Sequence, residues 1–137
     1  MDVDEYRRRF RAADHAYLAT TGQDGRPHLV PVVVALVGLE IAFAVDDKPK
    51  RTTSLRRLRN IAENPRVAFL ADHYDGDWTR LWWVRADAVA RVVEIGQQRE
   101  EALAALRVRH PQYADHPPSG AVVVARVVRW SGWAASG

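Results

Sequence analysis

Hydrophobic residues recur along this chain with two periods, one typical of helices and the other typical of strands. Near the start, apolar side chains at helical spacing among charged residues predict a short amphipathic helix over residues 2–12. Residues 16–21 then follow a strand pattern, Gly22 and Gly25 favour a tight turn, and the apolar run 28–37 returns as the partner strand. The chain is therefore expected to open with a helix and a β-hairpin.

The middle of the chain predicts a strand, a helix and a long pair of strands. Apolar residues at every second position indicate a third strand over residues 39–45. Hydroxyl side chains at 52–54 can cap a helix that an Asn-Pro pair then ends. Residues 67–74 and 78–93 predict two antiparallel strands joined by a tight turn.

The last part of the chain predicts one more helix and one more strand. Residues 97–110 form an amphipathic pattern that prolines stop, and residues 121–130 read as a closing strand. Because neighbouring strands are linked by hairpins rather than crossovers, the pattern favours a six-stranded antiparallel barrel with flanking helices. A chain of 137 residues is long enough for one core, so residues 1–137 are taken as a single domain.

Composition narrows the possible chemistry. The chain is 47% hydrophobic and 27% charged and contains no cysteine, which excludes disulfides, thiolate nucleophiles and iron–sulfur ligation. The N-terminus is charged from the start, without the apolar core of a signal peptide. The longest apolar stretch, Leu29 to Leu39, is well short of the ~20 residues that a membrane-spanning helix needs. A cytoplasmic protein that does not bind membranes is expected.

Charge is concentrated in one segment, although the net charge is only +3. Six cations and no acid occur between residues 48 and 59: Lys48, Lys50, Arg51, Arg56, Arg57 and Arg59. Arg56 and Arg57 fall in the first turn of the predicted helix, where the helix dipole disfavours cations. A bound phosphate would remove this conflict, and a solvated basic surface is the alternative interpretation.

The chain resembles the pyridoxamine-phosphate-oxidase-like, FMN-binding split barrels from Ala16 to Trp133. Three blocks carry the resemblance: residues 18–21 with 24–32, residues 57–67, and residues 82–85. The resemblance implies a split β-barrel and a homodimer with its cofactor at the subunit interface. It also implies an oxidoreductase that acts on a small organic substrate through its cofactor rather than through a catalytic side chain.

Within that family, residues 48–51 and 72–85 look like the actinobacterial branch that depends on the deazaflavin coenzyme F420. The cofactor is accordingly expected to be F420, with FMN as the alternative. A protein of the same fold that binds a cofactor without turnover is a second alternative.

The resemblance also implies positions for the cofactor. The ring would lie along the strand after the hairpin, at Val30, Pro31, Val32 and Val33. The phosphate would be held at Val45, Arg56 and Arg57, in a pocket that Lys48, Lys50 and Arg51 extend. Trp83 stands where the family has a glutamine, so a stacking wall replaces a hydrogen-bonding side chain there. Trp133 matches an aromatic residue that approaches the cofactor near the family's C-terminus.

The sequence also raises the possibility of a metal site and of a nucleic-acid-binding site. Asp72, His73, Asp75 and Asp77 are close in sequence and of metal-binding type, but strand alternation separates the first two and Asp75-Gly76-Asp77 is typical of a turn. No metal is therefore expected. A barrel that binds single-stranded nucleic acid is the main rival class, which the small charge excess disfavours.

Overall fold

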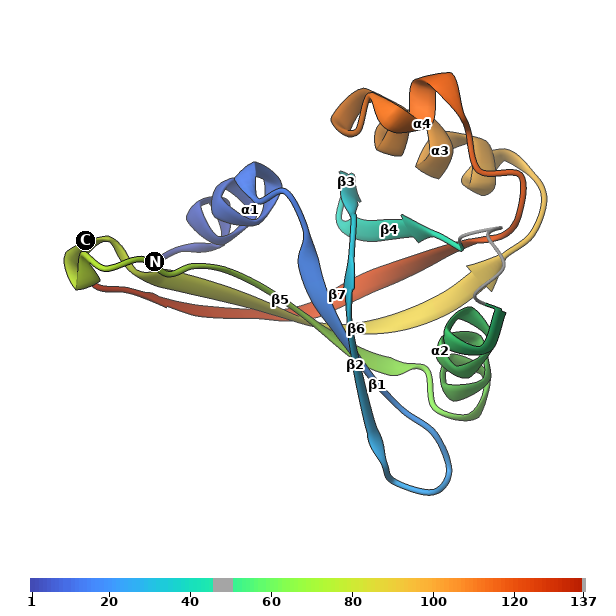
Figure 1. Cartoon of the computed structure of the whole chain (residues 1–137), viewed down its shortest axis with the longest axis horizontal. Coiled ribbons are helices and arrows are strands. Elements are labelled where there is room, and N and C mark those ends of the chain that lie inside the picture. Colours follow the sequence, from blue (N-terminus) through green and yellow to red (C-terminus); the bar gives the residue numbers. More distant parts are fainter. Residues whose placement is uncertain (46–50, 137) are drawn as a thin grey trace.

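The computed structural model describes residues 1–45 and 51–136, and for residues 51–55 only the backbone. It is an antiparallel sheet with helices packed around it (Figure 1). The elements are α1 Val3–Ala12, β1 Ala16–Thr21, β2 Pro27–Val32, β3 Ala35–Val37, β4 Glu40–Ala44, α2 Arg51–Glu63, β5 Arg66–His73, the 3-10 helix η1 Trp78–Arg80, β6 Trp82–Val93, α3 Gln97–Arg109, α4 Gln112–Asp115 and β7 Val122–Ala134. No helix among the described residues is long and apolar enough to cross a membrane.

The described sheet has seven strands in the order β2-β1-β5-β6-β7-β4-β3 and does not close. The expected mainly antiparallel sheet with flanking helices is confirmed, but the prediction of a six-stranded barrel is wrong in the number of strands and in that the described sheet stays open. The run 28–37 divides into β2, which pairs with β1, and β3, which pairs with β4 at the other edge of the sheet. Val33 and Val34 make this bend while remaining apolar, so the hydrophobic pattern does not reveal it.

Two further boundaries differ from the expectation. Trp78 is not in a strand but starts the 3-10 helix η1, with its side chain 77% exposed. The helix α2 begins at Arg51, so Arg56 and Arg57 lie beyond its first turn. The predicted conflict between these two arginines and the start of the helix is therefore wrong, because the dipole effect fades beyond the first turn.

The inner face of the sheet carries the main core. Phe10 from α1, Phe43 from β4 and Phe69 from β5 are buried there, and Phe69 makes edge-to-face contacts with the other two at 6.4 and 6.1 Å between ring centres. Alternation along β6 places Val84, Ala86, Ala88 and Ala90 on this face.

The outer face is covered at one end only. There α3 packs Leu103 and Leu106 against Ala42 of β4 and Val122 of β7, in a second apolar cluster. His110, next after α3, reinforces this packing because its Nε2 lies 2.8 Å from the carbonyl oxygen of Val34. The other end is formed by β2, β1, β5 and the first half of β6, with the last part of β7 beside them, and no described helix packs on it; we call it the open outer face.

Candidate functional site

The basic residues expected to hold phosphate lie on the second turn of α2. Arg56 and Arg57 are half-buried, whereas Arg59 is exposed. Both half-buried arginines act on His28 of β2: burial, and then the charges of Arg57 and Arg56, lower the pKa of His28 below its usual 6.5. Neighbouring cations lower the pKa of a histidine because they disfavour its positively charged form, so this shift indicates a positive local potential. We call this group of Arg56, Arg57 and His28 the basic corner.

Contacts between α2 and the first hairpin hold the basic corner in place. Asn60 on α2 donates a hydrogen bond of 3.0 Å to the Thr20 hydroxyl on β1, and both groups are buried. His28 lies directly opposite Thr20 in the ladder between β1 and β2. Its Nδ1 atom is buried and has no hydrogen-bond partner in the described part of the chain. The corner thus combines positive charge with an unsatisfied polar atom.

The residues expected beside the cofactor ring do not share one face. Val30 packs against the inner core, and Val32 is buried within it. Val45, which was expected at the phosphate, also packs against the inner core. Pro31 is exposed and lies opposite Tyr17, on the outer side. Val33 follows β2 and lines a separate hollow beside α3 and α4. The side chains of Val30, Pro31 and Val32 therefore share no common surface, and only the backbone of β2 connects the three positions.

Among the described strands, β2 is an edge strand, which pairs with β1 on one side and with no other strand on its second side. Pro27 and Pro31 fit this position, because proline has no N–H to donate and is confined to edge strands, strand starts and bulges. An edge strand leaves backbone groups available to a ligand. The other predicted phosphate residues are not placed: Lys48 and Lys50 lie outside the described residues, and only the backbone of Arg51 is described.

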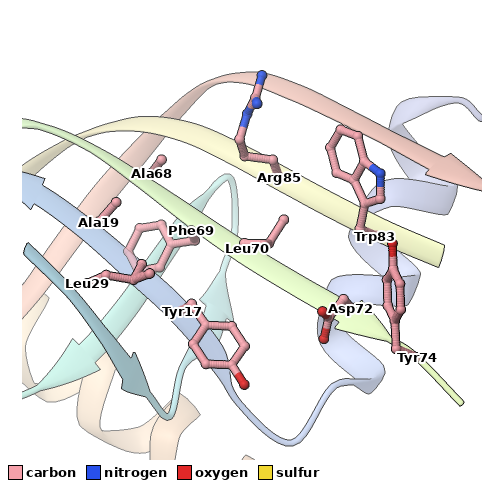
Figure 2. A pocket seen from close by; sticks show the side chains of 10 residues that line it. All are labelled: Tyr17, Ala19, Leu29, Ala68, Phe69, Leu70, Asp72, Tyr74, Trp83 and Arg85. Atoms are coloured by element: carbon pink, nitrogen blue, oxygen red, sulfur yellow. The ribbon is translucent and has the colours of Figure 1, made fainter. Parts of the chain in front are cut away.

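Trp83 and Trp133 lie on the open outer face, away from the basic corner's side of the sheet. They are direct neighbours in the ladder between β6 and β7, and Trp133 is 45% exposed. Beside them is a cavity of about 470 Å³ (Figure 2). Its walls are Tyr17, Tyr74, Trp83 and Arg85, and its floor includes Ala19 and Ala68.

Sequence reasoning missed most of this cavity. Tyr17, Tyr74 and Arg85 were not candidates, and Asp72 was considered only as a metal ligand, although alternation along β1, β5 and β6 places the residues of these strands on one face. What alternation does not show is the register. The ladders place Tyr17 beside Leu70 and Leu70 beside Arg85, so three distant segments meet.

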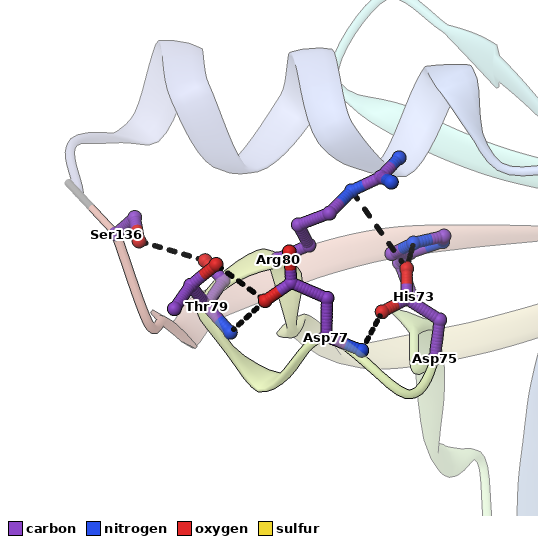
Figure 3. A network of polar contacts seen from close by, with 6 residues as sticks. All are labelled: His73, Asp75, Asp77, Thr79, Arg80 and Ser136. Atoms are coloured by element: carbon purple, nitrogen blue, oxygen red, sulfur yellow. Dashed lines mark hydrogen bonds and ion pairs between the residues drawn. The ribbon is translucent and has the colours of Figure 1, made fainter.

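The acidic cluster considered as a metal site is a turn (Figure 3). Asp75 accepts a hydrogen bond from the Asp77 backbone at 2.8 Å, and Asp77 accepts from the backbone and hydroxyl of Thr79 at 3.1 and 2.6 Å. A hydrogen bond of 2.7 Å with His73 lowers the pKa of Asp75. Ser136 donates to the Thr79 carbonyl at 2.7 Å, which ties the end of the chain to this turn. These carboxylates are used by turn and capping contacts, as the sequence interpretation expected.

An open, mainly antiparallel sheet with an edge strand beside a basic corner defines the class of fold. Residues 3–134 match the family model described as pyridoxamine 5'-phosphate oxidase, so the chain belongs to that family. The resemblance stated from the sequence is confirmed at this level. A search of curated proteins found no match.

Solved structures share the fold at low sequence identity. A conserved hypothetical protein of Mycobacterium tuberculosis, Rv2991, is 23% identical, with a TM-score of 0.78 over 98% of this chain and 86% of that one. The heme storage protein HutZ of Vibrio cholerae is 17% identical, with a TM-score of 0.73 over 98% and 95%. An FAD-binding protein of Mycobacterium smegmatis is 19% identical, with a TM-score of 0.68 over 97% and 96%.

Proposed function

We propose that this protein is an oxidoreductase that binds a flavin-type cofactor and uses it to transfer a hydride to a small organic substrate. The observation that carries the proposal is the basic corner beside the edge strand β2, in a chain that belongs to the pyridoxamine 5'-phosphate oxidase family. Among proteins of the same fold, one is named for FAD binding. The cofactor supplies the hydride chemistry when bound, and the protein supplies position and electrostatics.

The described residues fit such a cofactor at two points. Arg56 and Arg57 offer half-buried guanidinium groups, which bind phosphate strongly because their hydrogen bonds are charge-assisted. The free edge of β2 offers backbone groups to the polar edge of a ring. Binding a phosphate would also place a negative charge near His28, whose pKa the two arginines lower.

The deazaflavin F420 is the cofactor we favour, with FMN as the alternative. Trp83 supports this choice, because an indole stands where the family's glutamine would give a flavin a hydrogen-bond partner. An apolar wall suits a ring that lacks one of the flavin's nitrogen atoms. We further propose that a second copy of the chain covers the open outer face, so that Trp83 of one subunit approaches the cofactor held by the other.

Titration tests the cofactor directly. F420, FMN and heme are each added to the protein, and binding is followed by quenching of the tryptophan fluorescence and by calorimetry. We expect F420 to bind most tightly and FMN more weakly. Preferred binding of heme, or binding of neither flavin, would contradict the proposal.

The first prediction concerns the two arginines. The double variant Arg56→Gln, Arg57→Gln should weaken cofactor binding by about 100-fold or more, because charge-assisted hydrogen bonds contribute roughly 1.5–3 kcal/mol each. Arg59→Gln is the matched control, since Arg59 is an exposed arginine of the same helix. Circular dichroism should show an unchanged fold in all variants. Equal affinity in the double variant and the control would remove the basic corner from the cofactor site.

A further inference from the structure

The cavity on the open outer face has the composition of a binding site for a flat molecule. Three aromatic side chains, Tyr17, Tyr74 and Trp83, line it together with alanine and leucine residues, and Figure 2 shows the three around the cavity, with Tyr74 just beyond the end of β5. Its volume of about 470 Å³ lies within the range of small-molecule pockets. Three aromatic side chains around one cavity favour a planar ring system, which can stack on them, over a branched aliphatic one.

One rung of the sheet beside this cavity contains a buried hydroxyl without a hydrogen bond. Arg85 on β6 and Ser131 on β7 are direct neighbours in the ladder. The Ser131 Oγ atom is buried and makes no hydrogen bond within the described part of the chain, whereas the buried Arg85 Nε atom lies 3.3 Å from the Asp87 carboxylate. Buried polar atoms usually have hydrogen-bond partners, so the Ser131 hydroxyl beside a half-exposed arginine calls for an explanation. A bound polar group at this rung would provide it.

The charge of Arg85 defines the kind of group. Its guanidinium lies 5.9 Å from the centre of the Trp83 ring and forms an ion pair of 3.3 Å with Asp87, yet the side chain remains 43% exposed. An arginine at an aromatic wall can pair with a carboxylate while the ring of the same ligand stacks nearby. Asp72 also lines the cavity, and Figure 2 shows its carboxylate directed away from Arg85. A second negative charge on the ligand would be repelled there.

We propose that this cavity binds a planar aromatic monocarboxylate, with the carboxylate on Arg85 and the ring against Trp83 and the two tyrosines. This proposal rests on the proposed function in one respect: it takes aromatic monocarboxylates as the substrates of the oxidoreductase. The binding site itself depends only on the residues of the open outer face.

Three probes separate charge from shape: 2-naphthoate, its neutral isostere 2-naphthamide, and the non-planar anion cyclohexanecarboxylate. Calorimetry on the full chain should show 2-naphthoate binding about tenfold more tightly than either of the others. Weaker binding of 2-naphthoate than of 2-naphthamide, or equal binding of both anions, would overturn the proposal.

Variants then assign the effect to Arg85. Arg85→Gln should abolish the preference for 2-naphthoate over 2-naphthamide, and Arg85→Lys should restore part of it. Asp87→Asn is the matched control, because it removes the same ion pair but keeps the guanidinium. If Asp87→Asn removes the preference as completely as Arg85→Gln does, Arg85 acts through structure and the proposal fails. Trp83→Gln should weaken both naphthalene probes but not cyclohexanecarboxylate.

The cofactor titration keeps this proposal distinct from the proposed function. Binding of 2-naphthoate that survives in the Arg56→Gln, Arg57→Gln variant supports the cavity even where the cofactor is lost. Binding of 2-naphthoate to a chain that binds no flavin would sink the proposed function and leave the cavity standing. Mutually exclusive binding of 2-naphthoate and the cofactor would show that the cavity is part of the cofactor site and would overturn the inference.

Discussion

His28 is the residue at which charge in the basic corner can be measured. Burial and the charges of Arg57 and Arg56 lower its pKa, so the folded protein favours the neutral imidazole more than the unfolded chain does. Below the usual pKa of 6.5, the unfolded chain takes up a proton more readily than the folded one. Stability from this group is therefore present at neutral pH and is lost as the pH falls through 6.5.

The second prediction follows from this loss of stability at lower pH. Between about pH 7.5 and about pH 5.5, His28→Gln should lose less stability than the unmodified protein, as measured by urea unfolding. Added inorganic phosphate should reduce the difference, because an anion beside Arg56 and Arg57 raises the pKa of His28 again. An identical pH dependence in protein and variant would show that the arginines do not act on His28.

At the scale of elements, α2 must lie very close to the first hairpin. A β-carbon on Gly22 would lie 2.6 Å from the Glu63 carboxylate and 2.7 Å from the Asn60 side-chain oxygen. Glu63 in turn accepts a hydrogen bond of 2.9 Å from the backbone of Gln23. The close approach of α2 therefore depends on a residue without a side chain at position 22.

The third prediction tests this packing. Gly22→Ala should destabilise the protein by about 1–3 kcal/mol. The added methyl group would displace the side-chain oxygens of Glu63 and Asn60 and disturb the contacts that they make. Gly76→Ala is the matched control, since a β-carbon there meets nothing within 4 Å and should change stability by less than about 0.5 kcal/mol. Thermal unfolding of both variants measures the difference. Similar losses of stability in the two variants would mean that α2 does not pack closely against the hairpin at Gly22.

The elements themselves were largely predictable, whereas their arrangement was not. Period and turn chemistry located α1, β1 and α3 close to their observed bounds, whereas the strand expected from Trp78 begins at Trp82. The bend at Val33 was hidden because both sides of it are apolar. The start of α2 was misplaced because hydroxyl residues at 52–54 looked like caps although the helix already begins at Arg51.

For the candidate site, sequence reasoning located the two arginines of the basic corner but only Trp83 of the cavity. Arg56 and Arg57 stand out as a local run of charge, which needs no knowledge of the fold. Tyr17, Asp72 and Arg85 become neighbours only through the ladders of β1, β5 and β6. Register between distant strands depends on packing across the whole sheet, so no local pattern predicts it.

At the scale of the whole molecule, the two ends of the outer face differ. One end is covered by α3, while the open end exposes Leu29 by 67%, Val128 by 54% and Trp133 by 45%. Apolar groups gathered on an uncovered sheet face are typical of an interface. The second copy that we propose would bury these apolar side chains in a twofold interface.

The fourth prediction is that Leu29→Lys converts the proposed dimer into a folded monomer, since the charged ammonium group would have to be buried in the interface. Leu39→Lys is the matched control, because Leu39 is 77% exposed in the turn between β3 and β4, away from the open outer face. Sedimentation velocity should show a dimer for the protein and the control only.

If the cofactor lies between the two copies, its affinity for the unmodified protein must rise with protein concentration, whereas its affinity for Leu29→Lys must be low and independent of concentration. A monomer that binds the cofactor as tightly as the unmodified protein would confine the whole site to one chain.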